Sequence, residues 1–582
     1  MGGQIIVIGA GAAGLSAALS LADKNIKVLL VSDQPSERTQ SVMAEGGMNA
    51  ALISEGSEDS VQKHAEETLQ AGRNLADRQA VEGMTQAAPL IVEKLYSQGM
   101  SWTLNEAKQP QRRAFGGQKY KRTAFAADST GKQLMHTLTE QVRRYEAEGC
   151  IKRKIGWQFL KLLYSQEKAG AVSESTEDGA AERRVCGCVL YDELREQYEA
   201  VYGEGVIIAS GGLNGLFGNA TGSVRNTGYV TASLFADGIP LANGEFIQYH
   251  PTTVRLHGKQ MLITEAARGE GGRLFVERNG KPYYFMEEKY PELGNLMPRD
   301  VVSREEWKLM AEGYQIWLDI RGLDADIYKN RLRGVVDACQ TFLGLDPTKK
   351  SIPIAPGIHY FMGGIRVDRE HRTAVRGLYA AGECACQYHG ANRLGGNSLL
   401  GALYGGQKAA ESAVFDLTME EEAEDYRHVL NRTGEESLSN SGKVSEQRNV
   451  PGVFKSENEN AADRMKKLQS ILRESLGIIR DEKELQSGLE AVRKLSESVK
   501  EKDEADTLIL ENKRFKDSCL LGEAMLLSAL NRKESRGAHQ RSDYPEELQA
   551  YQKTTLARYT KDGIQISFEA IDESNGGSEA WR

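Results

Sequence analysis

The glycine pattern near the N-terminus restricts the start of this chain to one local fold. Gly9, Gly11 and Gly14 form G-x-G-x-x-G directly after the apolar run 5–8, and a second apolar run occupies residues 28–31. A continuous apolar run is typical of a parallel strand that is covered on both faces. The order strand, glycine turn, helix and strand therefore predicts a dinucleotide-binding βαβ unit, in which the helix N-terminus faces a pyrophosphate.

Three further features favour a flavin nucleotide over NAD. Ser32 ends the second predicted strand, where NAD-binding proteins carry an acidic residue. The segments 205–212 and 378–383 are also apolar runs, and they end in Gly-Gly and Gly-Glu. Separated strands that return to one sheet suit a long two-part cofactor such as FAD, which lies across several strand ends. The alternative is that they are ordinary strands of a large sheet.

The composition argues against several classes of protein. The 582 residues carry a formal net charge of −9, which gives no support to nucleic-acid binding. Seven cysteines include the pairs Cys186/Cys188 and Cys384/Cys386, but neither pair has a second pair nearby, so we expect no metal site and no iron–sulfur cluster in this chain. The chain opens on a strand and has no apolar run of about 18 residues. We therefore expect no signal peptide, no membrane span of its own and a cytoplasmic location.

Polar motifs in the rest of the chain are more specific. The five main motifs are QYHPT (248–252), TEAARGEGG (264–272), PRD (298–300), IHYFMGG (358–364) and HGANRLGGNSLL (389–400). Three more are RAFGG (113–117), RTAFAADSTG (122–131) and ESRGAHQRSDYP (534–545). With these motifs in this order, the chain closely resembles the flavoprotein subunit of succinate dehydrogenase and fumarate reductase over nearly its whole length.

The resemblance implies an α/β fold. Its parts are a Rossmann-like FAD-binding domain of the glutathione-reductase type, an inserted α+β capping domain and a C-terminal helical bundle. The expected boundaries are 1–230 and 351–415 for the FAD-binding domain, 231–350 for the capping or substrate domain, 416–463 for a charged flexible connector, 464–545 for the helical domain and 546–582 for a short C-terminal tail.

The resemblance also implies a site for a C4 dicarboxylate. Such a substrate needs cations or hydrogen-bond donors at both ends, and a planar guanidinium can bind both oxygens of one carboxylate. The residues at the positions that the family uses are His250, Thr264, His359, Arg393 and Gly396. Without the resemblance, each histidine would more often be structural.

The family's reaction transfers a hydride between flavin N5 and one substrate carbon, while a proton is added to or removed from the neighbouring carbon. The family's acid is the arginine of PRD, here Arg299, and Glu265 and Arg268 match the relay that returns its proton. A guanidinium is a poor acid, with a pKa above about 12. Positive charge from Arg268 favours proton loss from Arg299. PRDVVSR is also compatible with a simple helix start.

The family's flavin contacts map onto glycines, small residues and one acid. The N-terminus of the helix that opens at Asn397 would stabilise an anionic reduced flavin. The candidate cofactor-binding residues are Gly9, Gly11, Ala13, Gly14, Ser32, Ser41, Ala44, Gly46, Gly47, Ala209, Gly211, Glu383, Asn397, Ser398 and Leu399.

Two positions depart from the family pattern. Many members bind FAD covalently through a histidine before A-Q-G-G, but the aligned residue here is Gln40. We therefore predict non-covalent FAD, which favours fumarate reduction over succinate oxidation. The family's N-T-G-D-G is Asn-Thr-Gly-Tyr-Val at 226–230.

The resemblance implies a separate iron–sulfur subunit as the electron-transfer partner. A membrane anchor subunit would then hold the complex at the inner face of the membrane. Three other functions remain open. They are L-aspartate oxidase, a reductase for another enoate, and a non-catalytic FAD-binding module for electron transfer.

Overall fold

The computed structural model describes residues 3–52, 58–166, 183–256, 258–431, 459–499 and 506–571. Its N-terminal part is built on a parallel sheet with strand order β19-β10-β1-β2-β6. These strands are β1 (Gln4–Ile8), β2 (Lys27–Ser32), β6 (Ile151–Ile155), β10 (Gly205–Ile208) and β19 (Leu378–Ala380). The predicted βαβ unit and the return of two later segments to the same sheet are therefore confirmed.

Both faces of this sheet are covered, which explains its uninterrupted apolar strands. Side chains alternate along a strand. Ile5 and Val7 of β1 pack against helices, whereas Ile6 and Ile8 pack against a three-stranded antiparallel sheet. The helices on this side are α1 (Ala12–Ala22), α3 (Arg78–Ser97), α4 (Thr130–Ala147) and α11 (Asn397–Asn431), and the covering strands are β7 (Trp157–Gln166), β8 (Arg183–Asp192) and β9 (Gln197–Tyr202).

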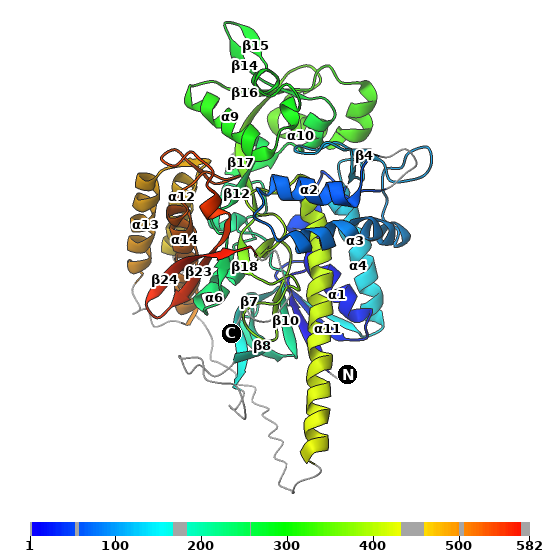
Figure 1. The fold of residues 1–582 in the computed structure, drawn as a ribbon, viewed down its shortest axis with the longest axis vertical. Helices are drawn as coiled ribbons and strands as arrows, with labels where there is room; N and C mark the ends of the chain where they lie inside the picture. Colours follow the sequence, from blue (N-terminus) through cyan, green and yellow to red (C-terminus); the bar gives the residue numbers. More distant parts are fainter. Residues whose placement is uncertain are drawn as a thin grey trace.

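The inserted capping unit is seen in green at the top of Figure 1. It contains a six-stranded sheet with order β13-β12-β17-β16-β14-β15. The strands are β12 (Ile247–Leu256), β13 (Lys259–Leu262), β14 (Arg273–Arg278), β15 (Lys281–Tyr283), β16 (Ile316–Asp319) and β17 (Ile352–Phe361), and the helices are α7 (Ala266–Gly269), α8 (Phe285–Lys289), α9 (Arg299–Ala311) and α10 (Arg333–Leu343). β12 and β17 extend from this unit toward the parallel sheet, so they connect the two parts.

The C-terminal helices α12 (Glu459–Ser475), α13 (Glu482–Glu497) and α14 (Asp506–Asn531) form a separate layer, seen in orange in Figure 1. They share a core that includes Leu472, Leu485 and Leu526.

Shorter elements complete the fold. They are α2 (Val61–Ala71), α5 (Asn214–Phe217), α6 (Tyr229–Ala236), β3 (Met48–Asn49), β4 (Arg112–Arg113), β5 (Thr123–Ala124), β21 (Ile479–Arg480) and β22 (Gln540–Arg541).

Two expected boundaries differ from the structure. The segment predicted as a connector from residue 416 begins inside α11, which continues to Asn431, and residues 432–458 lie outside the described residues. The segment predicted as a short tail contains a hairpin, β23 (Lys553–Thr560) and β24 (Gly563–Ala570). Only its last residues, 572–582, lie outside the described part.

The hairpin completes a five-stranded sheet with order β20-β18-β11-β23-β24. β11 (Leu241–Ala242), β18 (Gly364–Arg366) and β20 (Ala385–Cys386) supply the other strands. Leu556 and Ala557 are buried where β23 pairs with β11. An isolated two-stranded hairpin is marginally stable, so this burial explains why the segment is ordered. None of the helices in the described ranges is long and apolar enough to cross a lipid bilayer.

Candidate functional site

A continuous cavity of about 460 Å³ runs from the glycine turn after β1 to the base of the capping unit. It brings together most of the residues that the sequence singles out. At the cofactor end it is lined by Gly9, Gly11, Ala13, Ser32, Ser41, Ala44, Gly46, Gly47, Ala209, Gly211, Glu383, Ser398 and Leu399. At the substrate end it is lined by His250, Thr264, Glu265, Arg299, His359, Arg393 and Gly396.

The glycine turn has the shape that a pyrophosphate requires. Gly9 has φ +112°, and a Cβ atom on Gly14 would lie 1.8 Å from the Gly9 carbonyl oxygen. Gly11 is the N-cap of α1 and has no side chain to occupy the space in front of the helix. The backbone N–H of Ala12 donates to Ser41 Oγ at 3.0 Å. The first turn of a helix leaves N–H groups without intrahelical acceptors, so this end of the cavity suits a phosphate group.

Other cofactor-end residues fit a dinucleotide with a flavin ring. The Ser32 hydroxyl donates to the Gln34 carbonyl at 2.6 Å, which leaves its oxygen able to accept from a ribose hydroxyl. Glu383 is enclosed, and its Oε1 accepts from the Phe361 N–H at 3.1 Å. Burial raises the pKa of Glu383 to about 7, and it raises that of the cavity-lining Glu45 to about 8.

Three predicted site residues do not line this cavity. Gly14 packs against the backbone of Gly9 and does not reach the cavity. Arg268 forms an ion pair with Glu265, and it is Glu265 that lines the cavity. Asn397 begins α11 as predicted, but its side chain belongs to a buried network with Asn49, His64 and Thr68. This network fixes the start of α11, while the next residues, Ser398 and Leu399, reach the cavity.

Two histidines, the buried His250 and the half-buried His359, lie together at the substrate end. The rings of His250 and His359 are 5.0 Å apart and meet edge to face. His250 Nδ1 accepts from the Thr252 N–H at 3.2 Å, so its Nε2 carries the proton. Burial, helped by nearby Arg299, lowers the pKa of both imidazoles well below the usual range. Both are therefore neutral near pH 7, and a neutral imidazole has one N–H donor and one acceptor nitrogen. His359 Nδ1 lies 2.8 Å from Thr221 Oγ1.

Arg393 supplies a cation beside the histidines. Its guanidinium carbon lies 4.3 Å from the ring centroid of Tyr360, and its buried Nε has no hydrogen-bond partner among the described residues. Burial and the charge of Arg299 lower the pKa of Arg393 to about 9. A buried donor without a partner is costly, so this arginine is arranged to receive an anion.

Arg299, Glu265 and Arg268 form a buried chain of ion pairs. Arg299 donates from Nε and Nη2 to Glu265 Oε2 at 3.0 and 2.6 Å. Arg268 donates from Nη2 to the other carboxylate oxygen at 2.9 Å. Burial opposes ionisation of Glu265, but the two guanidinium groups outweigh it and hold the pKa below the ordinary value. The structure thus links all three residues that the sequence assigns to proton transfer.

The geometry adds Gln248, which lies within the quoted motif QYHPT but was not assigned a role. Its Oε1 accepts from Arg299 Nη1 at 3.0 Å, and its Nε2 donates to the Arg393 carbonyl and to Asn392 Oδ1, both at 2.8 Å. One amide therefore holds both cavity arginines in place. The motif QYHPT was the only signal in the sequence that pointed to Gln248. It does not show that Gln248 contacts Arg299, which lies 51 residues later in the chain.

The charges at the substrate end favour a dianion. Among the buried charged side chains at this end, Arg268, Arg299 and Arg393 are positive and Glu265 is negative, and both histidines are neutral, so these groups carry a net charge of +2. The exposed Lys259 also lines the cavity and adds to the positive charge. A ligand with two carboxylates would neutralise this charge. In a site of low effective dielectric, such pairing is strong.

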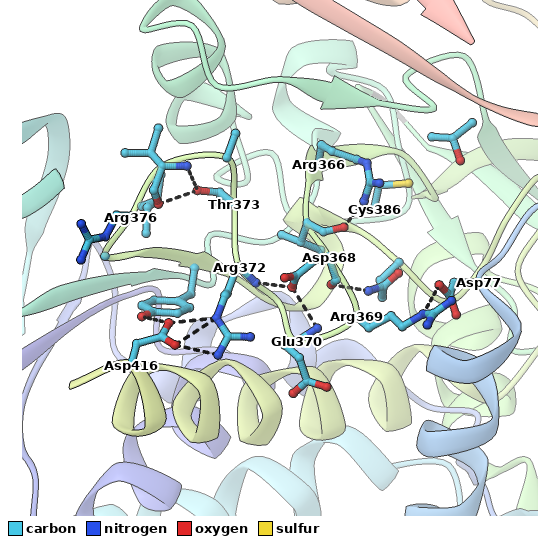
Figure 2. A pocket seen from close by; sticks show the side chains of 18 of the residues that line it. Asp77, Arg366, Asp368, Arg369, Glu370, Arg372, Thr373, Arg376, Cys386 and Asp416 are labelled. Atoms are coloured by element: carbon cyan, nitrogen blue, oxygen red, sulfur yellow. Dashed lines mark hydrogen bonds and ion pairs between the residues drawn. The ribbon is translucent and has the colours of Figure 1, made fainter. Parts of the chain in front are cut away.

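A second cavity of about 940 Å³, shown in Figure 2, lies between residues 366–379 and α11. Two of its labelled arginines are paired with acids of the same chain: Arg372 with Asp416 at 2.7 Å and Arg369 with Asp77 at 2.5 Å. None of the predicted site residues lines it. Within the described ranges, no group of three His, Cys, Asp or Glu side chains is arranged to hold a metal ion.

Comparison with known families agrees with these features. A family model described as FAD binding domain matches residues 4–399, and a model described as fumarate reductase flavoprotein C-term matches residues 465–576. Together they cover the parallel sheet, the capping unit and the C-terminal layer.

Individual relatives align over almost their whole length. The succinate dehydrogenase flavoprotein subunit of Bacillus subtilis is 36% identical and covers 98% of this chain and 97% of its own. The fumarate reductase flavoprotein subunit of Mycobacterium tuberculosis is 34% identical, with 93% and 92% covered. Among solved structures, the FrdA chain of an E. coli quinol fumarate reductase variant has a TM-score of 0.80 and 28% identity, with 99% and 97% covered.

Proposed function

Because this chain belongs to the flavoprotein-subunit family of succinate dehydrogenase and fumarate reductase, we propose that it interconverts fumarate and succinate, with fumarate reduction favoured. It is an FAD-dependent oxidoreductase, as its family is. The observation that carries the proposal is one cavity that joins a dinucleotide cradle to a pocket whose buried charged groups are positive in sum.

The cofactor end of the cavity fits FAD. Gly9, Gly11 and the first turn of α1 would hold the pyrophosphate, and Ser32 would accept from the adenosine ribose. Ser398 and Leu399, at the start of α11, would face the flavin ring. When bound, FAD supplies or accepts the hydride.

The protein's own residues bind and protonate the substrate. His250, His359 and Arg393 donate hydrogen bonds to the carboxylates, and Thr264 lines the same end. Arg299 gives a proton to the substrate carbon, or removes one in the reverse direction. Glu265 is hydrogen-bonded to both Arg299 and Arg268, so a proton can return to Arg299 along the chain. Burial excludes bulk water from this transfer.

The proposal includes non-covalent FAD. Gln40 replaces the histidine to which flavin is attached in many members, and its Oε1 accepts from the Ser223 N–H at 2.6 Å. An amide side chain is not a nucleophile. Mass spectrometry of the denatured chain tests this: the mass should equal that of the polypeptide alone, and an added flavin mass would contradict it.

The proposal also includes an electron-transfer partner. The relatives named above are flavoprotein subunits, so we infer a separate iron–sulfur subunit in the complex of this chain. Anaerobic copurification tests for such a partner. The same preparation should oxidise reduced viologen with fumarate and reduce a dye with succinate. Oxygen-dependent turnover of aspartate, or turnover of only another enoate, would instead support one of the alternative enzymes.

A further inference from the structure

The turn that connects α8 to α9 carries a buried polar residue that the mechanism above does not use. Asn295 lies in this turn, within the 3-10 segment Gly294–Leu296, and is 8% exposed. Arg299, the proposed acid, is the first residue of α9 and follows shortly after this segment. The position of the turn therefore influences where the acid begins its helix.

The same residue contacts the other arginine of the ion-pair chain. Arg268 Nη1 donates to the Asn295 carbonyl oxygen at 2.6 Å, while Arg268 Nη2 donates to Glu265 Oε1 at 2.9 Å. The third nitrogen of this guanidinium, Nε, has no hydrogen-bond partner among the described residues. The orientation of Arg268 toward Glu265 thus depends on where the Asn295 carbonyl is held.

Both ends of the Asn295 side-chain amide hold the turn in place. Oδ1 accepts from the backbone N–H of Leu274 on β14 at 2.9 Å, and Nδ2 donates to Glu287 Oε1 on α8 at 2.9 Å. Glu287 is in turn paired with Arg273. Asn295 is not among the residues that line the cavity. Its side chain therefore ties its own carbonyl to a strand and a helix of the capping unit, outside the substrate site.

The RAFGG motif holds the same turn from the FAD-binding part. The Gly117 N–H donates to the Leu296 carbonyl at 2.8 Å, and the Gly116 N–H donates to Glu265 Oε1 at 3.2 Å. These backbone contacts do not involve the Asn295 side chain. A substitution at Asn295 should therefore release the carbonyl that holds Arg268 and still leave the turn attached to the rest of the fold.

We propose that Asn295 is a positioning residue of the proton relay, which sets the orientation of Arg268 and so the rate at which a proton returns through Glu265 to Arg299. This inference rests on the proposed function, because it needs Arg299 to be the acid. Asn295 carries no proton itself and acts through Arg268. Small shifts matter here, since a misplacement of about 1 Å can cost about 10²-fold in rate.

The first test is Asn295→Asp, which keeps the shape of the side chain and the acceptor for the Leu274 N–H. It loses the donor to Glu287 and brings two carboxylates together. We expect turnover to fall about tenfold or more, with a larger solvent deuterium isotope effect and with FAD content and the KM for fumarate near those of the wild type. The matched control is Asn330→Asp in the same unit. Asn330 is exposed, its Nδ2 donates to Asp326 at 2.6 Å, and its replacement should leave the rate unchanged.

A second substitution separates positioning from general damage. When Asn295→Asp is combined with Glu287→Gln, the new amide can donate to the new carboxylate, so the pair is restored with donor and acceptor exchanged. We expect this double variant to recover most of the lost turnover, and Glu287→Gln alone to stay near the wild type. Wild-type rate and isotope effect in Asn295→Asp, or a double variant as slow as Asn295→Asp, would overturn the role of Asn295.

Crystal structures of the variants separate this inference from the proposed function, because they need no turnover. The Arg268 guanidinium should move away from the carbonyl of residue 295 in Asn295→Asp and return to it in the double variant. An unmoved Arg268 in Asn295→Asp would overturn the role of Asn295. A wild type that is inactive with both fumarate and succinate would instead contradict the proposed function, even where Arg268 moves as expected.

Discussion

Arg299 donates two hydrogen bonds to the same oxygen of Glu265, at 3.0 and 2.6 Å, across 34 residues of sequence. The other oxygen of Glu265 accepts from Arg268. The carboxylate therefore holds the Nε/Nη2 edge of the Arg299 guanidinium, while Nη1 donates to Gln248. The proposed acid is thus fixed in one orientation and is joined through Glu265 to Arg268, the next residue of the proposed relay.

Replacement of Arg299 should separate chemistry from cofactor binding. Arg299→Lys keeps a positive charge but cannot reproduce the planar fork of hydrogen bonds to Glu265. We expect FAD content near that of the wild type and a fall in turnover of at least about 10²–10⁴-fold. Flavin absorbance and the viologen–fumarate assay measure the two effects. Full activity in this variant would exclude Arg299 as the acid.

Glu265→Gln should slow turnover by about 10²-fold or more, because the amide cannot relay a proton between the two arginines. It should also change the effect of pH on stability. The folded-state pKa of Glu265 is below its ordinary value of 4.5, so its contribution is complete above that pH and is lost as the pH falls through the folded-state pKa. The difference in Tm between wild type and variant should shrink below about pH 4.5. A constant difference would contradict the assigned ionisation.

His359 provides a second test of pH dependence. Its folded-state pKa is well below 6.5 because the ring is buried, so the unfolded chain takes up a proton that the folded chain does not. The wild type should therefore lose stability relative to His359→Gln as the pH falls below about 6.5. Thermal unfolding at several pH values measures this, with His136→Gln, at an exposed position of α4, as control. An equal pH slope in wild type and His359→Gln would show that the ring is not held neutral.

Gly396→Ala should disrupt the junction between cofactor and substrate ends. Gly396 has φ +86°, and a Cβ atom would lie 2.1 Å from Asn49 Oδ1. Gly313→Ala is the matched control. Gly313 has φ +90°, so an alanine there is strained in the backbone, but no atom lies within 4 Å of its Cβ position and no clash results. Backbone strain of this kind costs about 1–3 kcal/mol. We expect a larger fall in Tm and in FAD content for Gly396→Ala. Equal effects would mean that Asn49 moves away freely.

Parts of this fold and site can be predicted from sequence because their cause is local. The glycine turn at residues 9–14 follows from backbone conformation and close approach, and the parallel strands follow from continuous apolar runs. Pro298 precedes the first residue of α9, so the start of that helix was also visible. The substrate residues were identified through their motifs, and the structure brings them to one cavity.

Other features have no local signature. The alternating polar and apolar residues of 563–570 are typical of a strand, yet the segment was expected to be a tail. Its order depends on pairing with β23, which in turn pairs with β11 more than 300 residues earlier. The side chain of Asn397 is hydrogen-bonded to Asn49 of β3 and Thr68 of α2, and no sequence motif predicts these contacts.

The sequence by itself determined the βαβ unit, because glycine geometry and strand periodicity act over a few neighbouring positions. The candidate acid and the kind of ligand followed from the resemblance of its motifs to a known family. Only the tertiary structure decided which partners hold that acid. Glu265 and Gln248 contact it because α7, α9 and β12 pack together, and those contacts depend on how distant segments meet.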